Sequence, residues 1–232
     1  MSTHWFVDEL AHAGPEHLDP GFVAGFDRKQ GRPDPSDDLA ALAAHGVGEG
    51  ATVVDLGAGT GQFALAAAER FARVVAVDIS PAMVASMRER AECRGLATLE
   101  CVRAGFLSYD HTGEPADAVY TRHALHQLPD FWKTQALVRI ANMLRPGGVL
   151  RVRDLIYDFR PDQAGEFFDK WLAGAVDDPA AGYTREDYIE HIQTEHSTYR
   201  WLFEPMLEAC GFEIVDVGFH GSIYGAYTCV KR

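Results

Sequence analysis

Residues 53–61 read VVDLGAGTG: a short apolar run that contains one aspartate, and then glycine at every second position. This pattern predicts a buried strand that enters a glycine-rich turn and continues into a helix. Glycine suits such a turn because it adopts dihedral angles that other residues avoid, and because a ligand can approach its backbone without meeting a side chain. The turn is therefore the first candidate for a ligand site.

Asp55 and the spacing of the glycines limit which ligand this turn binds. A dinucleotide site prefers G-x-G-x-x-G, but here the third glycine, Gly61, comes one position early and Gln62 stands in its place. A carboxylate at Asp55 repels a doubly anionic pyrophosphate and attracts an ammonium group. An NAD-dependent oxidoreductase is therefore the alternative interpretation and not the preferred one.

Apolar runs alternate with helical patterns from residue 51 to residue 152. We predict strands at 52–56, 73–77, 98–102, 118–121 and 149–152, with helices at 62–71, from 81 onward, and at 131–144. Two further strands are predicted at 213–219 and 224–230. This alternation indicates a Rossmann-like α/β fold, in which a mostly parallel, seven-stranded sheet carries helices on both faces.

The 232 residues are predicted to form a single domain. Its parts are an N-terminal cap segment at 1–35, a core at 36–156, a helical lid or insertion at 157–198, and a last helix with the sheet edge at 199–232. In the insertion we predict helices at 163–176 and 184–194, the second with Thr184 as its N-cap.

Asp78 ends the second predicted strand, 17 residues after Gly61. An acid at this place accepts hydrogen bonds from both ribose hydroxyls of a nucleoside. The other interpretation of Asp78 is the N-cap of the next helix, but Ser80 is better placed for that role because Pro81 follows it in the first turn.

Three segments resemble the class I S-adenosylmethionine-dependent methyltransferase family in their order and spacing: VVDLGAGTG at 53–61, VVAVDIS at 74–80 and LRPGGVL at 144–150. The resemblance covers about residues 37–152. It implies S-adenosylmethionine as cofactor, with its ribose on Asp78 and its adenine against Ile79 and Met83. It also implies that the methionine portion lies against Asp55, Gly57, Ala58, Gly59, Gly61, Thr121 and Arg122.

One segment departs from the pattern of that family. Its members often carry an acid in a Gly-Asp-Phe-like segment after the third strand, where the acid contacts the adenine amino group. Here the segment reads Ala104-Gly105-Phe106. The resemblance still implies adenine packing on Phe106 and a backbone hydrogen bond at Gly105, but the side-chain contact is missing.

Histidines are the candidate catalytic residues. An imidazole titrates near neutral pH and accepts a proton from an attacking hydroxyl or amine. We name His123, which follows the fourth strand, and His196, which has Glu195 beside it. For His123 the competing interpretation is packing alone, which is favoured for His126. For His196 the competing interpretation is a histidine at a helix end that caps carbonyl groups. Methyl transfer from a sulfonium depends mainly on positioning and on exclusion of water, and the cap segment and the insertion are candidates for the lid that this requires.

Composition limits the partners. The net charge is −13 and the 21 lysines and arginines are scattered, which disfavours nucleic acid. The four cysteines lack zinc-site spacing, so no metal site is predicted. Without a signal peptide or an apolar span of about 20 residues, we expect a cytoplasmic protein with no membrane partner, and a homodimer is compatible with the sequence.

The predicted function is transfer of a methyl group to a small-molecule acceptor, with S-adenosylhomocysteine as the product. Besides the oxidoreductase, a non-catalytic S-adenosylmethionine-binding protein is an alternative, because no residue type in the sequence identifies the base for the acceptor. A protein or RNA acceptor stays open, although residues 121–124 read TRHA and lack the Asn-Pro-Pro-Tyr pattern of enzymes that methylate exocyclic amines of bases.

Overall fold

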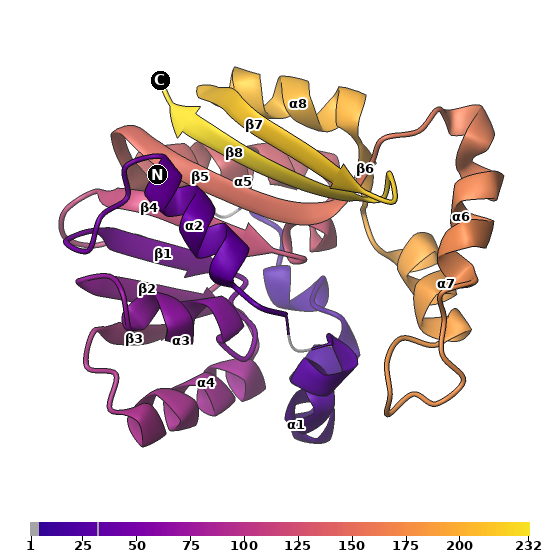
Figure 1. Ribbon diagram of the computed structural model, residues 1–232, viewed down its shortest axis with the longest axis horizontal. Coiled ribbons are helices and arrows are strands. Elements are labelled where there is room, and N and C mark those ends of the chain that lie inside the picture. Colours follow the sequence, from indigo (N-terminus) through magenta and orange to yellow (C-terminus); the bar gives the residue numbers. More distant parts are fainter. Residues whose placement is uncertain (1–4, 32) are drawn as a thin grey trace.

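A single twisted sheet forms the centre of the computed structural model, which describes residues 5–31 and 33–232 (Figure 1). The strand order is β3-β2-β1-β4-β5-β8-β7, and a two-residue strand, β6, pairs with the end of β5 outside this order. The strands are β1 (Thr52–Leu56), β2 (Arg73–Asp78), β3 (Leu99–Arg103), β4 (Ala116–Arg122), β5 (Leu144–Tyr157), β6 (Thr198–Tyr199), β7 (Phe212–His220) and β8 (Tyr224–Lys231).

The first five strands pair in parallel, whereas β8 runs antiparallel to both of its neighbours, β5 and β7. The predicted mostly parallel, seven-stranded sheet is therefore confirmed, and β6 is an addition that sequence reasoning did not predict. After β1 the chain forms β2 on one side of β1, and it later forms β4 on the other side of β1. This is a topological switch point, the place where open α/β sheets bind ligands at the carboxyl ends of their strands.

Helices cover both faces of the sheet. One apolar layer joins the sheet to α2, α3 and α4, and the other joins it to α5 and α8. The helices of the chain are α1 (Pro20–Lys29), α2 (Ser36–Ala44), α3 (Gln62–Ala68), α4 (Pro81–Arg94), α5 (Asp130–Met143), α6 (Ala164–Leu172), α7 (Arg185–Thr194) and α8 (Arg200–Ala209), with 3-10 turns η1 (Glu9–Ala11), η2 (Pro15–Leu18), η3 (Leu125–Gln127) and η4 (Pro161–Gln163).

The glycine turn links β1 to α3 as expected from its residues. Gly57 has a φ of 72°, and a Cβ built there would lie 2.3 Å from Cβ of Ala124, so neither the dihedral angle nor the space admits a side chain. Gly61 has a φ of 86° and caps the start of α3. Its built Cβ would lie 2.8 Å from Cγ of Met87, which fixes how closely α4 packs on the turn.

Both helix N-caps that the sequence predicts, Ser80 and Thr184, are present in the structure. Ser80 caps α4 by accepting a hydrogen bond from the N–H of Met83, and Thr184 caps α7 in a reciprocal pair with Asp187. The predicted strand at 149–152 is longer than expected. β5 begins at Leu144, directly after α5, and residues 145–148 form an irregularity in its pairing with β4.

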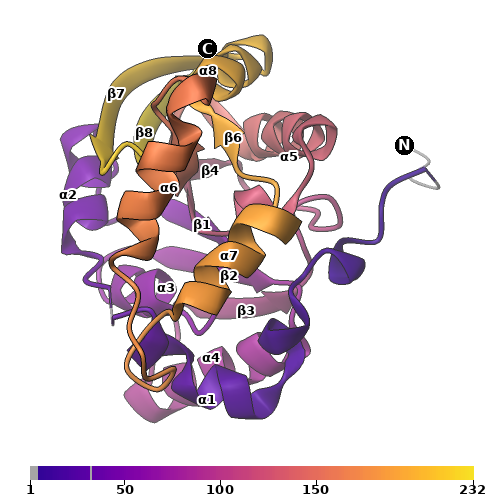
Figure 2. The ribbon, with the colours of Figure 1, turned by 90° about the vertical axis from the view of Figure 1, so that its right-hand side faces the viewer.

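The N-terminal segment and the insertion at 157–198 meet at the carboxyl ends of the strands. In Figure 2 the insertion faces the viewer, and α6 and α7 lie across those strand ends with α1 below them. Lys29 on α1 pairs with Asp187 on α7 at 2.8 Å, and Nε of Arg28 donates to the carbonyl oxygen of Ala180 at 2.9 Å. The two segments proposed as a lid therefore contact each other. Residues 1–4 and 32 of the predicted cap segment lie outside the described residues.

None of the helices in the described part of the chain is both long and apolar enough to cross a membrane.

Candidate functional site

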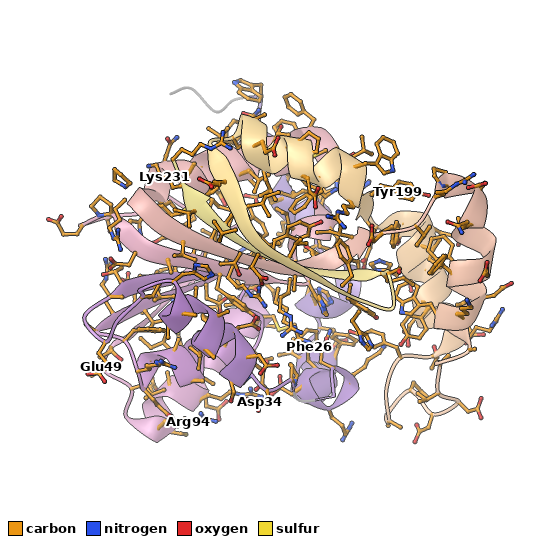
Figure 3. The ribbon with its side chains drawn as sticks, turned by 45° about the horizontal axis from the view of Figure 1, so that its top comes forward. Phe26, Asp34, Glu49, Arg94, Tyr199 and Lys231 are labelled. Carbon is orange, nitrogen blue, oxygen red and sulfur yellow. The ribbon has the colours of Figure 1, made fainter. Side chains whose placement is uncertain are left out.

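A cavity opens at the carboxyl ends of β1, β2 and β4, where the glycine turn lies. The empty space within its walls, including the mouth, is about 1250 Å³. Figure 3 labels Phe26 on α1 and Asp34 in the segment that leads to α2, and both residues line the cavity.

Two carboxylates from neighbouring strands face this cavity. Asp55 lies near the end of β1 and is 2% exposed, and Asp78 ends β2. Burial raises the pKa of Asp55 well above its usual range, and the negative charge of Asp78 raises it further. Burial also raises the pKa of Asp78, although two N–H donors oppose the shift. Such a pair favours a ligand that brings positive charge and hydroxyl donors.

Backbone amides hold Asp78 in place. Its Oδ1 accepts a hydrogen bond from the N–H of Ser80 at 2.8 Å, and its Oδ2 accepts one from the N–H of Gly59 at 2.8 Å. The second bond joins the carboxylate to the glycine turn, so the end of β2 and the turn after β1 form one rigid wall. Because each oxygen keeps a further lone pair, the carboxylate can still accept hydrogen bonds from a ligand.

Glu9, from the N-terminal segment, is a site residue that the sequence did not indicate. It lines the cavity and is 9% exposed. Its carboxylate accepts hydrogen bonds from the N–H of Leu107 at 2.9 Å and from Oγ of Ser108 at 2.9 Å. A Cβ built on Gly105 would lie 2.4 Å from Oε1 of Glu9. The carboxylate of Glu9 thus fills the place where a side chain at residue 105 would be, which is where the family often carries its acid.

The structure brings most of the predicted cofactor residues to the cavity wall. Ten of them line it: Asp55, Gly57, Ala58, Gly59, Asp78, Ile79, Met83, Gly105, Phe106 and Arg122. Gly61 and Thr121 do not. Gly61 caps the start of α3 and packs against Met87, and Thr121 is fully buried inside β4.

The N-terminal helix closes the cavity over the glycine turn. Phe26 approaches Gly59, whose built Cβ would lie 3.5 Å from the Phe26 ring. The next residue, Asp27, accepts a hydrogen bond from Thr60 in the turn and pairs with Arg90 of α4 at 2.5 Å. These contacts fasten α1 to the core beside the cavity.

His123 lines the cavity and has an unusual backbone. Its φ is 48°, in the left-handed region that side chains rarely occupy, and its N–H donates to the carbonyl oxygen of Arg153 at 2.8 Å. Burial lowers the pKa of His123 to about 3, and the charge of Arg122 adds to the effect. The imidazole is therefore uncharged at neutral pH, and it is a weak base because its pKa lies far below the working pH.

His196 lies apart from the cavity lining. Its ring faces the ring of His12 at 6.0 Å, its N–H donates to the carbonyl oxygen of His126 at 2.9 Å, and burial, together with the charge of Lys133, lowers its pKa. The acid expected to orient it, Glu195, contacts His126 and His191 instead.

His126 belongs to a buried polar cluster that sequence reasoning treated as packing. Its Nδ1 bonds the carboxylate of Asp154, which is 3% exposed, and its Nε2 lies 2.9 Å from Oε2 of Glu195. Burial alone would lower the pKa of His126, but the two acids oppose it more strongly and raise that pKa to about 10. The sequence signal for Asp154 was its place just after the predicted strand at 149–152, at the carboxyl edge of the sheet.

Comparisons with known proteins agree with this site. A family model described as a methyltransferase domain matches residues 53–148. The chain is 36% identical over 124 residues to the trans-aconitate 2-methyltransferase of Variovorax paradoxus, a match that covers 53% of this chain and 44% of that protein. It is 30% identical over 163 residues to an uncharacterized methyltransferase of Anoxybacillus flavithermus, covering 68% of this chain and 73% of the relative.

Among solved structures, the magnesium protoporphyrin IX methyltransferase of Synechocystis with bound S-adenosylmethionine has a TM-score of 0.66. That likeness covers 98% of this chain and 99% of the other at 16% identity, and it concerns the fold. In sequence, the chain spans about half the length of the first curated relatives that it matches. The two curated relatives named above and the family model carry methyltransferase names, in agreement with the three sequence motifs and the sheet order. This chain belongs to the class I S-adenosylmethionine-dependent methyltransferase family.

Proposed function

We propose that this chain binds S-adenosylmethionine in the cavity and transfers its methyl group to a small-molecule acceptor. The observation that carries the proposal is the pair of carboxylates, Asp55 and Asp78, that faces one cavity beside the glycine turn. A cofactor with an ammonium group, a sulfonium and two ribose hydroxyls satisfies both acids, whereas a pyrophosphate would meet Asp55 as an anion.

Each part of the cofactor has residues that suit it. Asp78 would accept hydrogen bonds from the ribose hydroxyls, and Asp55 would attract the ammonium group of the methionine portion. Ile79, Met83 and Phe106 supply the apolar walls for adenine. Glu9 would accept a hydrogen bond from the adenine amino group. It would take the place of the acid that members of the family often carry where this chain has Gly105.

When bound, the cofactor supplies a methyl group that is already activated on a sulfonium sulfur. The protein then has to align the acceptor and exclude water. Phe26 over the glycine turn, and α1 held to α7 through Lys29, provide that cover. His123 is uncharged and lines the cavity, so it can orient an acceptor hydroxyl or amine through a hydrogen bond. We assign no catalytic role to His196, because it lies outside the cavity lining.

Calorimetry tests the cofactor. Titration with S-adenosylmethionine and with S-adenosylhomocysteine should give one binding site per chain, and NAD should give no heat of binding. Asp78→Ala should remove binding, while the exposed Glu49→Ala should bind as the unchanged protein does. Binding of NAD alone, or equal binding by the Asp78 variant, would overturn the proposal.

A screen for turnover tests catalysis separately. The unchanged protein, incubated with S-adenosylmethionine and pools of small hydroxyl, amine and carbon acids, should release S-adenosylhomocysteine in at least one pool. If the cofactor binds but no pool releases S-adenosylhomocysteine, a non-catalytic binding protein is favoured. If S-adenosylhomocysteine is released only with protein or RNA fractions, the acceptor is a macromolecule.

A further inference from the structure

Three side chains from two segments converge beside the cavity: His126 in η3, and His191 in α7 with Glu195 directly after α7. One ring nitrogen of each histidine and a carboxylate oxygen of Glu195 all lie within 4.8 Å of one another. Nε2 of His126 lies 2.9 Å from Oε2 of Glu195, and Nδ1 of His191 contacts the same oxygen. Two nitrogens and one oxygen therefore lie close enough together to share one ion.

The other nitrogen of each ring has a partner of its own. Nδ1 of His126 bonds the carboxylate of Asp154, which is fixed in turn by the N–H of Leu155 at 2.7 Å. Nε2 of His191 lies 2.9 Å from Oγ of Ser197. Histidines that ligate metals almost always give their second nitrogen to a carboxylate or another polar group, which sets the tautomer and the ring orientation. Both rings here have that arrangement.

The carboxylate of Glu195 supplies an independent observation. Its Oε2 is buried and, among the residues that the structure describes, it has no hydrogen-bond partner. The two imidazole nitrogens lie beside it in ion-pair contacts. A buried carboxylate oxygen is costly unless positive charge lies beside it, and either a protonated imidazole or a metal ion held by the two rings can supply that charge. The side chain of Glu195 is only 20% exposed, so solvent gives it little compensation.

We propose that His126, His191 and Glu195 bind a divalent transition-metal ion of the zinc class. Two imidazoles and one carboxylate form a donor set that suits Zn²⁺, Fe²⁺ or Co²⁺, whereas Mg²⁺ and Ca²⁺ take oxygen ligands. Nε2 of His126 and Nδ1 of His191 are the ligating nitrogens, because their opposite ring nitrogens are taken by Asp154 and Ser197. Three protein ligands leave at least one coordination position open.

The position of the cluster gives this ion two consequences. It joins α7 of the insertion to η3 of the core, so an ion there fastens the insertion over the strand ends. The cluster also lies next to the cavity wall. Gln127 lines the cavity, and Nε2 of Gln127 lies 3.2 Å from Nε2 of His126. The open position is therefore near enough to the cavity for water or a heteroatom of an acceptor to occupy it.

Metal binding is measured on the whole chain, freed of any histidine tag and stripped with a chelator. Zn²⁺ titrated against a chromophoric chelator should bind as one ion per chain, and Co²⁺ should give visible absorption bands that Zn²⁺ abolishes. Loss of a residue that only supports a metal ligand lowers the metal affinity roughly 10–100-fold. Glu195→Gln and His191→Ala change proposed ligands, so each should lower the Zn²⁺ affinity by more than that. Exposed His45→Ala should bind as the unchanged protein does.

The same titration separates this inference from the proposed function, because no cofactor or acceptor is present in it. Circular dichroism checks that each variant is folded. If a variant unfolds, X-ray absorption at the zinc edge of the unchanged protein decides, and two imidazole nitrogens at about 2.0–2.1 Å are expected. Weak, non-stoichiometric binding, affinity that survives both substitutions, or a zinc shell containing sulfur would overturn the proposal. The cluster would then be an ion-pair network alone.

Discussion

At the scale of single residues, Glu9 shows a conflict between stability and binding. Burial raises its pKa, so the folded protein holds the Glu9 proton more tightly than the unfolded chain does. The stability linked to that proton is present at low pH and is lost as the pH rises through the raised pKa. Near neutral pH the carboxylate is thus a cost to the free protein, which a bound adenine amino group would offset.

Glu9→Gln tests this conflict. The variant should be more stable than the unchanged protein at neutral pH, with the difference shrinking as the pH falls. It should bind S-adenosylmethionine about tenfold or more weakly, since a hydrogen bond to a charged group is worth about 1.5–3 kcal/mol. Thermal unfolding between pH 4 and pH 7 and calorimetry measure the two effects. Unchanged affinity would remove Glu9 from the adenine site.

Asp55 predicts a proton release on cofactor binding. Its pKa is raised well above the usual range in the free protein, by burial and by Asp78. A cationic ligand favours the carboxylate form, so binding should expel a proton and the affinity should increase as the pH rises through that pKa. Calorimetry in buffers of different ionisation enthalpy counts the proton. Asp55→Asn should abolish the release, and adenosine, which lacks the ammonium group, should cause none. An equal release with adenosine would contradict this.

Sequence reasoning found the site residues that local pattern determines and missed those that folding assembles. Asp55 and Asp78 were predictable because each lies at or beside the end of a strand, next to a recognisable turn. Glu9 was not, because it reaches Gly105 across 96 positions of sequence and its own surroundings carry no motif. The pairing of Glu195 was also missed, since its neighbour His196 seemed the natural partner in sequence while the helix turn directs it to His191.

At the scale of elements, the contact between α1 and α7 is the joint of the proposed cover. Lys29 and Asp187 are partly buried, with side chains 16% and 26% exposed, and hydrogen bonds from Lys29 and Thr184 lower the pKa of Asp187 against the effect of burial. An ion pair this near the surface contributes about 0–1 kcal/mol to stability. Its main effect should therefore be on closure.

Lys29→Ala and Asp187→Asn should each raise KM for the acceptor several-fold while the melting temperature changes little, because Asn keeps a side-chain oxygen for the cap with Thr184. The double variant should be no worse than either single one, because both remove the same contact. Steady-state kinetics and thermal unfolding give the two readouts. Exposed Glu186→Ala, on the same helix, is the matched control. Additive losses in the double variant would show that the pair does not act as a joint.

The elements themselves were largely predictable, because the central strands contain short apolar runs that alternate with helical patterns. β1 has the predicted bounds, and Ser80 and Thr184 cap the helices that they were predicted to cap. The start of β5 was not predictable, since Pro146-Gly147-Gly148 signals a stop whereas pairing with β4 resumes on both sides of it. The two-residue β6 exists only through its pairing with the end of β5, which no local pattern encodes.

At the scale of the whole molecule, Asp38 joins α2 to the middle of the sheet. It is 1% exposed and accepts hydrogen bonds from Arg151, Arg153 and Tyr120, each at 3.0 Å. Removing one partner of a buried ion pair leaves uncompensated charge and costs about 3–5 kcal/mol. Asp38→Asn should therefore lower the free energy of unfolding by about 3 kcal/mol in chemical denaturation. Exposed Asp37→Asn should change it little, and equal effects of the two would refute the argument.

The cofactor site draws on segments distant in the chain, so binding should be felt by the whole molecule. Glu9, Phe26 and Asp27 come from the N-terminal segment, and α7 is tied to the same helix through Lys29. S-adenosylhomocysteine at 100 times its Kd should raise the free energy of unfolding by about 2.7 kcal/mol. Hydrogen exchange should slow in α1 (residues 20–29) and α7 (residues 185–194). Both helices are farther from the glycine turn in sequence than α3 is, so slower exchange there would report contacts made by folding. Protection confined to α3 and α4 would show that the cofactor binds without engaging the cover, and Lys29→Ala should reproduce that restricted pattern.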